Sequence, residues 1–174
     1  DTGIDYLHSD LAPNYRTDLD YDARDGDSDS FASAPDDDHG TTVSGVIAAA
    51  ANGSGAVGVA PEADITGFRI GFGAGPANQD LTQLQNTRNV DVANNSWSYN
   101  GIFTDNFRTS YFSQHETALR DAVTLGRGGL GTNLVWSAGN SRAIGDNVNH
   151  HNLQNSRYTI AVAASDIYGG IASF

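Results

Sequence analysis

Small apolar residues follow the polar stretch His39-Gly40-Thr41-Thr42 and form the run Val43–Ala51. This run has the propensity and spacing of a buried helix, so we expect a helix over residues 39–51. The patterns over residues 80–89 and about 108–125 predict two more helices. In the longer one, positions that recur near helical spacing are Tyr111, Phe112, His115, Leu119, Ala122 and Val123.

Strand patterns alternate with these helices. Buried strands are expected over residues 63–70, 90–97, 132–137 and 158–164, whereas the polar, aspartate-rich residues 14–35 predict an irregular loop. Strands that alternate with helices form βαβ units, and such units build a parallel sheet covered on both faces. The predicted fold is therefore α/β, with three layers and a mostly parallel, doubly wound sheet.

In a doubly wound sheet, functional residues collect beyond the carboxyl ends of the strands. Asp1, Ser96-Trp97 and Gly139-Asn140 fall at predicted strand ends, and His39 begins a predicted helix. We therefore expect Asp1, His39 and Asn140 to meet at one edge of the sheet. Taken singly, the histidine could merely start a helix, Asp1 could form a salt bridge and Asn140 could form a turn.

Composition narrows the class of protein. The chain has 174 residues, enough for one domain, and 39% of them are apolar. No apolar run approaches bilayer length, so no membrane span is expected. Cysteine is absent, which excludes disulfides and thiol chemistry. A secreted protein without disulfides needs another source of stability, and a bound metal ion is the usual one.

Negative charge is concentrated at the start of the chain. The net charge is −12, and residues 1–38 hold twelve aspartates against two arginines, a balance of −10 that leaves −2 for the other 136 residues. A nucleic-acid partner is not expected, because phosphate binding needs a basic surface. Densely placed carboxylates repel one another unless solvent or a hard cation such as calcium separates them.

Several motifs occur in a fixed order: Asp1-Thr2-Gly3, His39-Gly40-Thr41, Asn95-Ser96-Trp97 and Ser137-Ala138-Gly139-Asn140. Together they resemble the motifs of the subtilisin-like serine peptidases. Three further stretches are similar to the kexin/furin-like branch: His8–Tyr15, Arg127–Gly131 and Val135-Trp136. One short motif is weak, but several in order at family-like spacing are specific.

The resemblance implies roles for three residues. Asp1 would orient His39, His39 would take the proton from a serine hydroxyl, and the Asn140 amide would donate to the oxyanion. The family's Gly-Thr-Ser motif does not occur in this sequence. We therefore expect residues 1–174 to be a partial catalytic domain, cut at both ends, whose remainder carries the serine.

The resemblance also implies a polypeptide substrate. The strand with Ser96, Trp97 and Ser98 would pair with an extended peptide, and Ala138-Gly139 would line the primary pocket. Ser98 stands where the family usually has glycine. Asp36 matches one carboxylate that binds basic residues in furin-like enzymes, although residues 36–38 could equally form a solvated acidic loop. Thr2 replaces another of these acids. A preference for basic residues is therefore expected from the Asp36 match alone.

Two calcium sites and one further ligand are expected from the resemblance. The first site uses side chains of Asp10 and Asn52 with carbonyls of Ala50, Ser54 and Ala56, whose alternation directs oxygens into one turn. The second uses Asp22, Asp27 and Asp29, although these residues could instead form a solvated acidic loop. Asp146 matches a calcium ligand near the pocket floor. His8, His115, His150 and His151 are expected to be structural.

These expectations describe a secreted or extracytoplasmic, calcium-dependent serine endopeptidase. The alternative is a catalytically inactive, calcium-binding protease-like domain used for adhesion or as a scaffold. A serine in the downstream sequence distinguishes the two.

Overall fold

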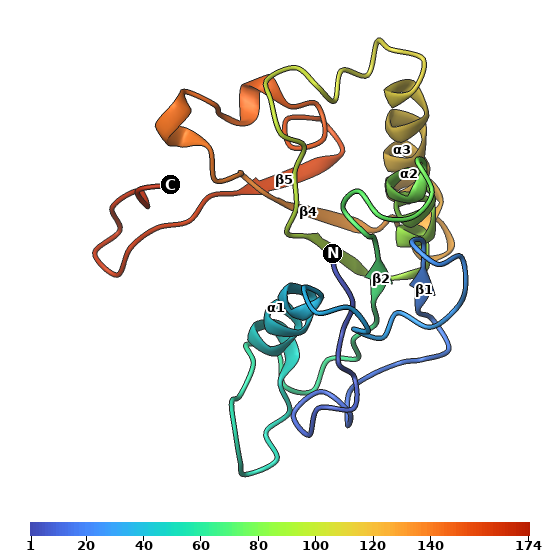
Figure 1. Cartoon of the computed structure of the whole chain (residues 1–174), viewed down its shortest axis with the longest axis vertical. Coiled ribbons are helices and arrows are strands. Elements are labelled where there is room, and N and C mark those ends of the chain that lie inside the picture. Colours follow the sequence, from blue (N-terminus) through green and yellow to red (C-terminus); the bar gives the residue numbers. More distant parts are fainter. The chain divides into compact units, whose positions relative to one another are not determined.

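The structure, a computed structural model, describes all 174 residues, Asp1–Phe174. The chain divides into two compact units, Asp1–Asn86 and Thr87–Phe174. Figure 1 labels the helices and strands of both, and each unit is described by itself.

The first unit contains a short parallel sheet. Strand β1, Tyr21–Asp22, pairs with β2, Phe68–Arg69. Isolated parallel bridges join Ile4 to Phe31 and Tyr15 to Ile65. The strand expected over residues 63–70 is therefore reduced to β2 and one bridge. Strand β1 lies in the stretch predicted to be irregular, and its Asp22 is buried by a charged partner rather than by apolar packing.

Two helices belong to the first unit: α1, Asp38–Ala48, and α2, Gln79–Asn86. Helix α1 confirms the helix expected at His39 but ends three residues early. Ala49 has ψ of 127°, and its carbonyl accepts from Gly58 N–H at 2.9 Å. A Cβ at Gly58 would overlap the backbone of Ala48 and Ala49, so the returning chain stops the helix by close approach.

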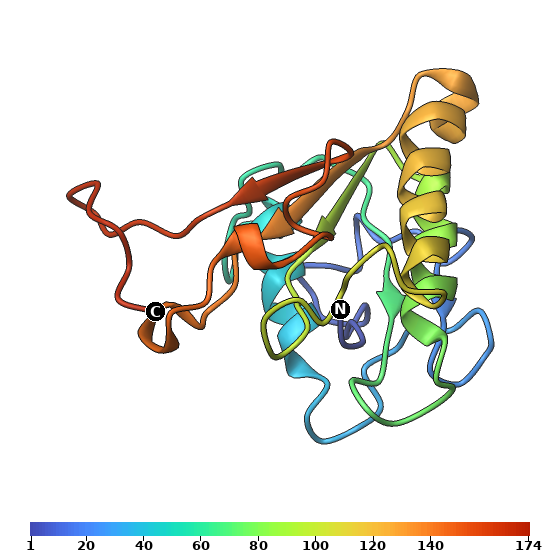
Figure 2. The same cartoon turned by 90° about the horizontal axis from the view of Figure 1, so that it is seen from above.

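The second unit is built on three parallel strands. They are β3, Val92–Asn95, β4, Asn133–Ser137, and β5, Thr159–Val162, in the order β3-β4-β5. Helix α3, Phe112–Gly129, connects β3 to β4 and contacts β4 (Figure 2). Its helical geometry stops at Gly126, in agreement with the predicted end near residue 125. Short 3₁₀ turns cover Thr87–Asn89 (η1), Arg142–Ile144 (η2) and Val148–His150 (η3).

Trp136 is the centre of the core in the second unit. It is fully buried, and its indole Nε1 donates to the Trp97 carbonyl at 2.7 Å. The two indole rings pack edge to face, with centroids 4.9 Å apart. Leu119 of α3 and Leu134 of β4 are also buried. The contact between Trp136 and Trp97 fixes the segment after β3 against β4.

The predicted α/β class with parallel strands is confirmed. Both sheets are parallel, and an α-helix lies between each pair of successive strands except β4 and β5, which are connected through 3₁₀ turns. None of the helices combines the length and apolar character that a membrane crossing requires.

Asp20 offers a test of the core of the first unit. Its carboxylate is buried and accepts from Tyr15 and Ser30, and burial raises its pKa, with nearby Asp29 adding to the effect. The Asp20 carboxyl group therefore stays protonated to higher pH in the folded protein than in the unfolded chain, where its pKa is about 3.9. The contribution of Asp20 to the free energy of unfolding then falls as pH rises above this value.

We expect the free energy of unfolding of Asp20→Asn, relative to the parent, to increase as pH rises from about 4 and then to level off. Urea unfolding of both proteins across this range measures the difference. A difference that stays constant with pH would contradict the assignment.

Candidate functional site

His39 and Asp1 form a close pair in the first unit. Nδ1 of His39 lies 2.8 Å from Oδ1 of Asp1. The Asp1 side chain is 15% exposed, whereas that of His39 is 56% exposed. Asp1 Oδ1 also accepts from the Thr2 N–H at 2.7 Å. The aspartate is therefore held beneath a histidine whose ring remains open to solvent.

This contact determines which ring nitrogen of His39 carries the proton. An ionised carboxylate only accepts hydrogen bonds, so Nδ1 is the donor. In the neutral ring Nε2 then has a free lone pair and can act as a base. The carboxylate also stabilises the imidazolium that forms when Nε2 takes a proton.

Thr2 and Gly40 hold the start of α1 against the segment that carries Asp1. Thr2 Oγ1 accepts from the Gly40 N–H at 2.7 Å and donates to the Asp37 carbonyl at 3.0 Å. A Cβ at Gly40 would overlap the carbonyl oxygens of Thr2 and Gly3. Glycine is required here because the helix and the segment touch through their backbones.

A cavity of about 230 Å³ lies in the second unit. Its lining brings together three residues expected to contact substrate, Ser98, Ala138 and Gly139, with Asp146. Ser98 follows the segment fixed by Trp97. Ala138 and Gly139 follow β4, where Gly139 turns the chain with φ of 88°.

The remaining residues expected at the site lie on the same segments or in exposed positions. Ser96 is half-buried and its hydroxyl accepts from Asn94 at 3.0 Å, whereas Trp97 is buried against Trp136. Asn140 is exposed directly after Gly139, and Asp36 is exposed in the turn before α1.

A histidine lies between two carboxylates in the second unit. His151 Nδ1 is 2.9 Å from Asp105 Oδ1, and its Nε2 is 3.0 Å from Asp146 Oδ2. His150 Nδ1 is 3.1 Å from the other oxygen of Asp146. Burial by itself would lower the pKa of His151, but the two aspartates outweigh it and raise this pKa. The hydrogen bond from His151 lowers the pKa of Asp146.

The first expected calcium loop is assembled. The buried Asp10 accepts from the Ala56 N–H at 2.9 Å and from the Asn52 amide at 3.2 Å, and both contacts lower its pKa. The Asp10 carbonyl accepts from the Ala50 N–H at 2.7 Å, and Asn52 Oδ1 accepts from the Ser54 N–H at 3.1 Å. Asp10 therefore lies against the loop of residues 50–56, and an N–H group already binds each of its carboxylate oxygens.

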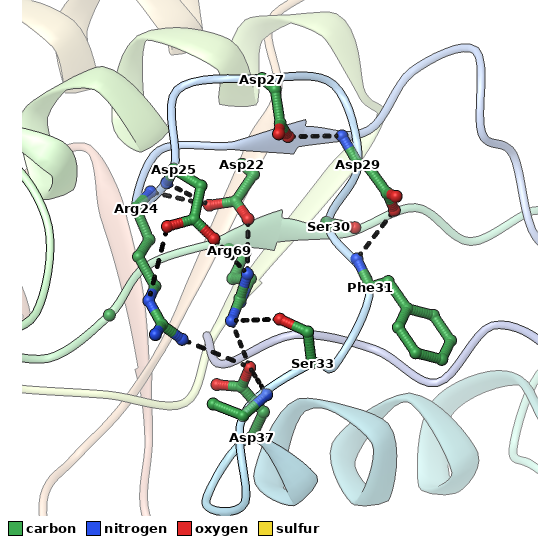
Figure 3. Close-up of polar contacts among 12 residues, drawn as sticks. Asp22, Arg24, Asp25, Asp27, Asp29, Ser30, Phe31, Ser33, Asp37 and Arg69 are labelled. Carbon is green, nitrogen blue, oxygen red and sulfur yellow. Dashed lines mark hydrogen bonds and ion pairs between the residues drawn. The ribbon is translucent and has the colours of Figure 1, made fainter.

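The second expected calcium group is not gathered. Asp22 is fully buried and binds Arg69 at 2.7 Å, whereas Asp27 accepts from the Asp29 N–H at 3.0 Å. Asp29 accepts from Tyr6 and Phe31. Figure 3 shows Asp22 directed to Arg69, with Asp27 and Asp29 farther along the loop.

Metal-binding clusters of three or more acidic, histidine or cysteine side chains do not occur in the chain. The oxygens of Asp22, Asp27 and Asp29 thus do not fit one cation as placed. The same holds for Asp146, because histidines occupy both of its oxygens.

Comparison with known proteins identifies the family of the chain. The model of the subtilase family of peptidases matches residues 1–174. The chain belongs to this family. Relatives in sequence include furin from Bos taurus, 33% identical over 98% of this chain and 22% of its own length. Neuroendocrine convertase 2 from Rattus norvegicus is 34% identical over 93% of this chain and 26% of its own length.

The similarity to furin and a neuroendocrine convertase confirms the predicted resemblance to the kexin/furin-like branch. A chain in the crystal structure of the complex of Aeromonas sobria serine protease and its chaperone superposes with a TM-score of 0.68 at 30% identity, covering 80% of this chain and 24% of that one. The subtilase chain spans about a quarter of the length of the curated relatives it matches.

Sequence reasoning missed several residues of the subtilase chain that shape the site. Arg69 interrupts an apolar strand pattern between Phe68 and Ile70, and a charge at such a position signals a buried partner. No pattern in the sequence marks Asp105, and the structural role expected for His151 names no partner. No short-range spacing connects Asp105 with His151, because they are 46 positions apart.

Gly55 and Gly53 provide a matched test of the Asp10 loop. Both have positive φ, 66° and 87°, but a Cβ at Gly55 would overlap the Asp10 carboxylate, whereas one at Gly53 meets no atom within 4 Å. We expect Gly53→Ala to cost about 1–2 kcal/mol of unfolding free energy from backbone strain alone. Gly55→Ala should cost about 1–3 kcal/mol more.

Denaturant unfolding of the two variants measures this difference. Equal losses of stability would show that the carboxylate does not lie against the loop.

Proposed function

We propose that the chain is part of the catalytic domain of a serine endopeptidase in which Asp1 orients His39 and His39 is the general base. The observation that carries the proposal is the 2.8 Å contact between Asp1 and His39 in a chain that matches the subtilase model from end to end. The His39 ring is more than half exposed, as access to a substrate requires.

Four groups take part in the proposed reaction. A serine from the remainder of the catalytic domain attacks the scissile carbonyl and gives its proton to Nε2 of His39. Asp1 stabilises the imidazolium, and the side-chain amide of Asn140 donates to the oxyanion. His39 then returns the proton to the leaving amine. Asn140 suits this role because it is exposed directly after a turn at the end of β4.

The remainder of the domain is the proposed partner of β5. Ile160 and Val162 of this strand are 55% and 53% exposed, an unusual state for apolar residues of a parallel sheet. A further layer or strand would cover them. Residues 1–174 are accordingly proposed to be one part of a single catalytic domain.

A polypeptide is the proposed substrate. An extended peptide would pair with the segment Ser96–Ser98 and place one side chain in the cavity lined by Ala138 and Gly139. Asp36, exposed near His39 in sequence, supports a preference for basic residues beside the cleaved bond. Asp146, expected as a calcium ligand near the pocket floor, is not proposed to bind an ion, because histidines occupy both of its oxygens.

Calcium is the proposed stabilising ion at the Asp10 loop. Asp10 would supply a carboxylate oxygen, Asn52 its side-chain oxygen, and Ala50, Ser54 and Ala56 their carbonyls; the ion would tie residue 10 to this loop. A secreted or extracytoplasmic setting is proposed with it, because weak calcium sites are filled where calcium is abundant. No ion is proposed at Asp22, Asp27 and Asp29, because their oxygens are not gathered and Arg69 already neutralises Asp22.

Reaction with a serine-directed phosphonate tests the proposed activity. The full-length protein is expected to be labelled covalently, and His39→Ala should slow labelling by about 10²–10⁴-fold, because the general base is lost. Asp38→Asn is the matched control: it changes the adjacent, exposed residue of the same helix and should react at the parent rate.

Mass spectrometry of the labelled protein follows both rates. A parent protein that is not labelled would favour the inactive, calcium-binding alternative.

Chelation tests the proposed ion. Adding a calcium chelator to the full-length protein should lower its Tm, because the ion binds only the folded loop. Asp10→Asn should abolish this response, whereas Asp27→Asn should retain it. Differential scanning calorimetry with and without chelator gives both comparisons. If the chelator does not change the Tm of the parent protein, calcium is excluded as its stabilising ion.

A further inference from the structure

The guanidinium of Arg69 lies inside the first unit and holds several acidic residues at once. The side chain is 2% exposed. Nη1 donates to Asp22 at 2.7 Å and to Asp25 at 3.0 Å, and Nη2 donates to Asp37 at 2.5 Å (Figure 3). Arginine suits this place because its planar fork presents several donors at fixed angles.

The backbone on either side of Arg69 holds Asp1. The Phe68 carbonyl accepts from the Asp1 nitrogen at 3.3 Å, and the Ile70 N–H donates to the Asp1 carbonyl at 2.8 Å. Arg69 therefore lies between the two backbone groups that fix the residue whose carboxylate binds His39.

Asp37 connects the guanidinium to the helix that carries His39. Asp37 is 4% exposed and precedes the first residue of α1. Its carboxylate points to Arg69 and makes no capping hydrogen bond to the helix. Its carbonyl instead accepts from Thr2 Oγ1, which in turn accepts from the Gly40 N–H. The start of α1 is thus held from outside the helix.

We propose that Arg69 is a positioning residue for the Asp1–His39 pair. Its backbone neighbours fix Asp1, and its guanidinium, acting through Asp37, fixes the helix start that presents His39. The expected effect on catalysis rests on the proposed peptidase function. The expected effect on the arrangement of Asp1 and His39 does not, because it can be measured in the folded protein without any activity. Removing Arg69 itself would leave buried carboxylates unpaired and destabilise the fold, so the test alters its partners.

Asp37→Ser is the decisive variant. A serine hydroxyl is too short to reach Arg69 but can still accept from the Ala34 N–H, which Asp37 now binds at 3.1 Å. Long-range ¹H–¹⁵N spectra of the full-length protein, labelled at its histidines and recorded at alkaline pH, show which ring nitrogen of His39 is protonated. The signals of His39 are assigned as the set that is missing from the spectrum of His39→Gln. We expect the Nδ1–H form in the parent and a shift toward the Nε2–H form in Asp37→Ser.

Kinetics give a second readout. For peptide hydrolysis, Asp37→Ser should lower kcat by about 10- to 100-fold with little change in KM, because the base is misplaced rather than the substrate weakly bound. A loss of stability alone would not move the tautomer of the folded protein or separate kcat from KM in this way.

Two control variants separate the Asp37 connection from the ion cluster as a whole. Asp25→Ser removes a partner of the same guanidinium, one that is 51% exposed, and should leave the tautomer and kcat unchanged. Asp37→Asn keeps an oxygen that can accept from Nη2 and should restore the parent behaviour. If Asp37→Ser does not fold, Thr2→Val removes the hydroxyl between Asp37 and Gly40 and should produce the same tautomer shift.

The proposal is overturned if Asp37→Ser, or Thr2→Val in its place, keeps the Nδ1–H form. It is also overturned if Asp25→Ser loses this form to the same extent, because the effect would then belong to the charge cluster in general. A parent protein that reacts with no phosphonate would remove the peptidase proposal, while the spectra would still decide the role of Arg69.

Discussion

The hydrogen bond between Asp1 and His39 is the interaction on which the functional account depends. It joins a residue that precedes the first sheet segment to the second residue of α1, 38 positions away. Neither side chain could hold this geometry alone. The backbone of Phe68 and Ile70 fixes the aspartate, and the backbone contact of Gly40 with Thr2 and Gly3 fixes the helix. The site is thus a consequence of packing between rigid elements, which is how catalytic groups are kept in one orientation.

The excess of aspartate in the first 38 residues is accommodated in three different ways. Asp22 and Asp37 share the buried Arg69, Asp10 accepts backbone and amide hydrogens from the Asn52–Ala56 loop, and Asp20 is buried against hydroxyl groups. The second unit uses histidine instead, with His151 between two carboxylates. A concentrated negative charge therefore does not by itself indicate a metal site. The Asp10 carboxylate, for instance, is met by N–H groups of Asn52 and Ala56.

The sequence predicted the architecture well where long apolar patterns were present. Helix α1, helix α3 and the three strands of the second unit were foreseen, because burial imposes a regular period on them. Strand β1 was missed, since charge pairing rather than apolar packing buries Asp22. The Asp1–His39 pair was foreseen from the predicted strand and helix ends together with the ordered family motifs. Arg69, Asp37 and Asp105 were not, because their partners are distant in sequence and buried charges carry no periodic signal.

The most direct test is a crystal structure of the full-length protein with a phosphonate bound to its serine. The account predicts a hydrogen bond between Asp1 Oδ1 and His39 Nδ1, with Nε2 facing the serine oxygen and the Asn140 amide directed at the phosphonyl oxygen. A structure in which the imidazole is turned away from Asp1, or in which Asn140 lies far from the phosphonyl group, would contradict it.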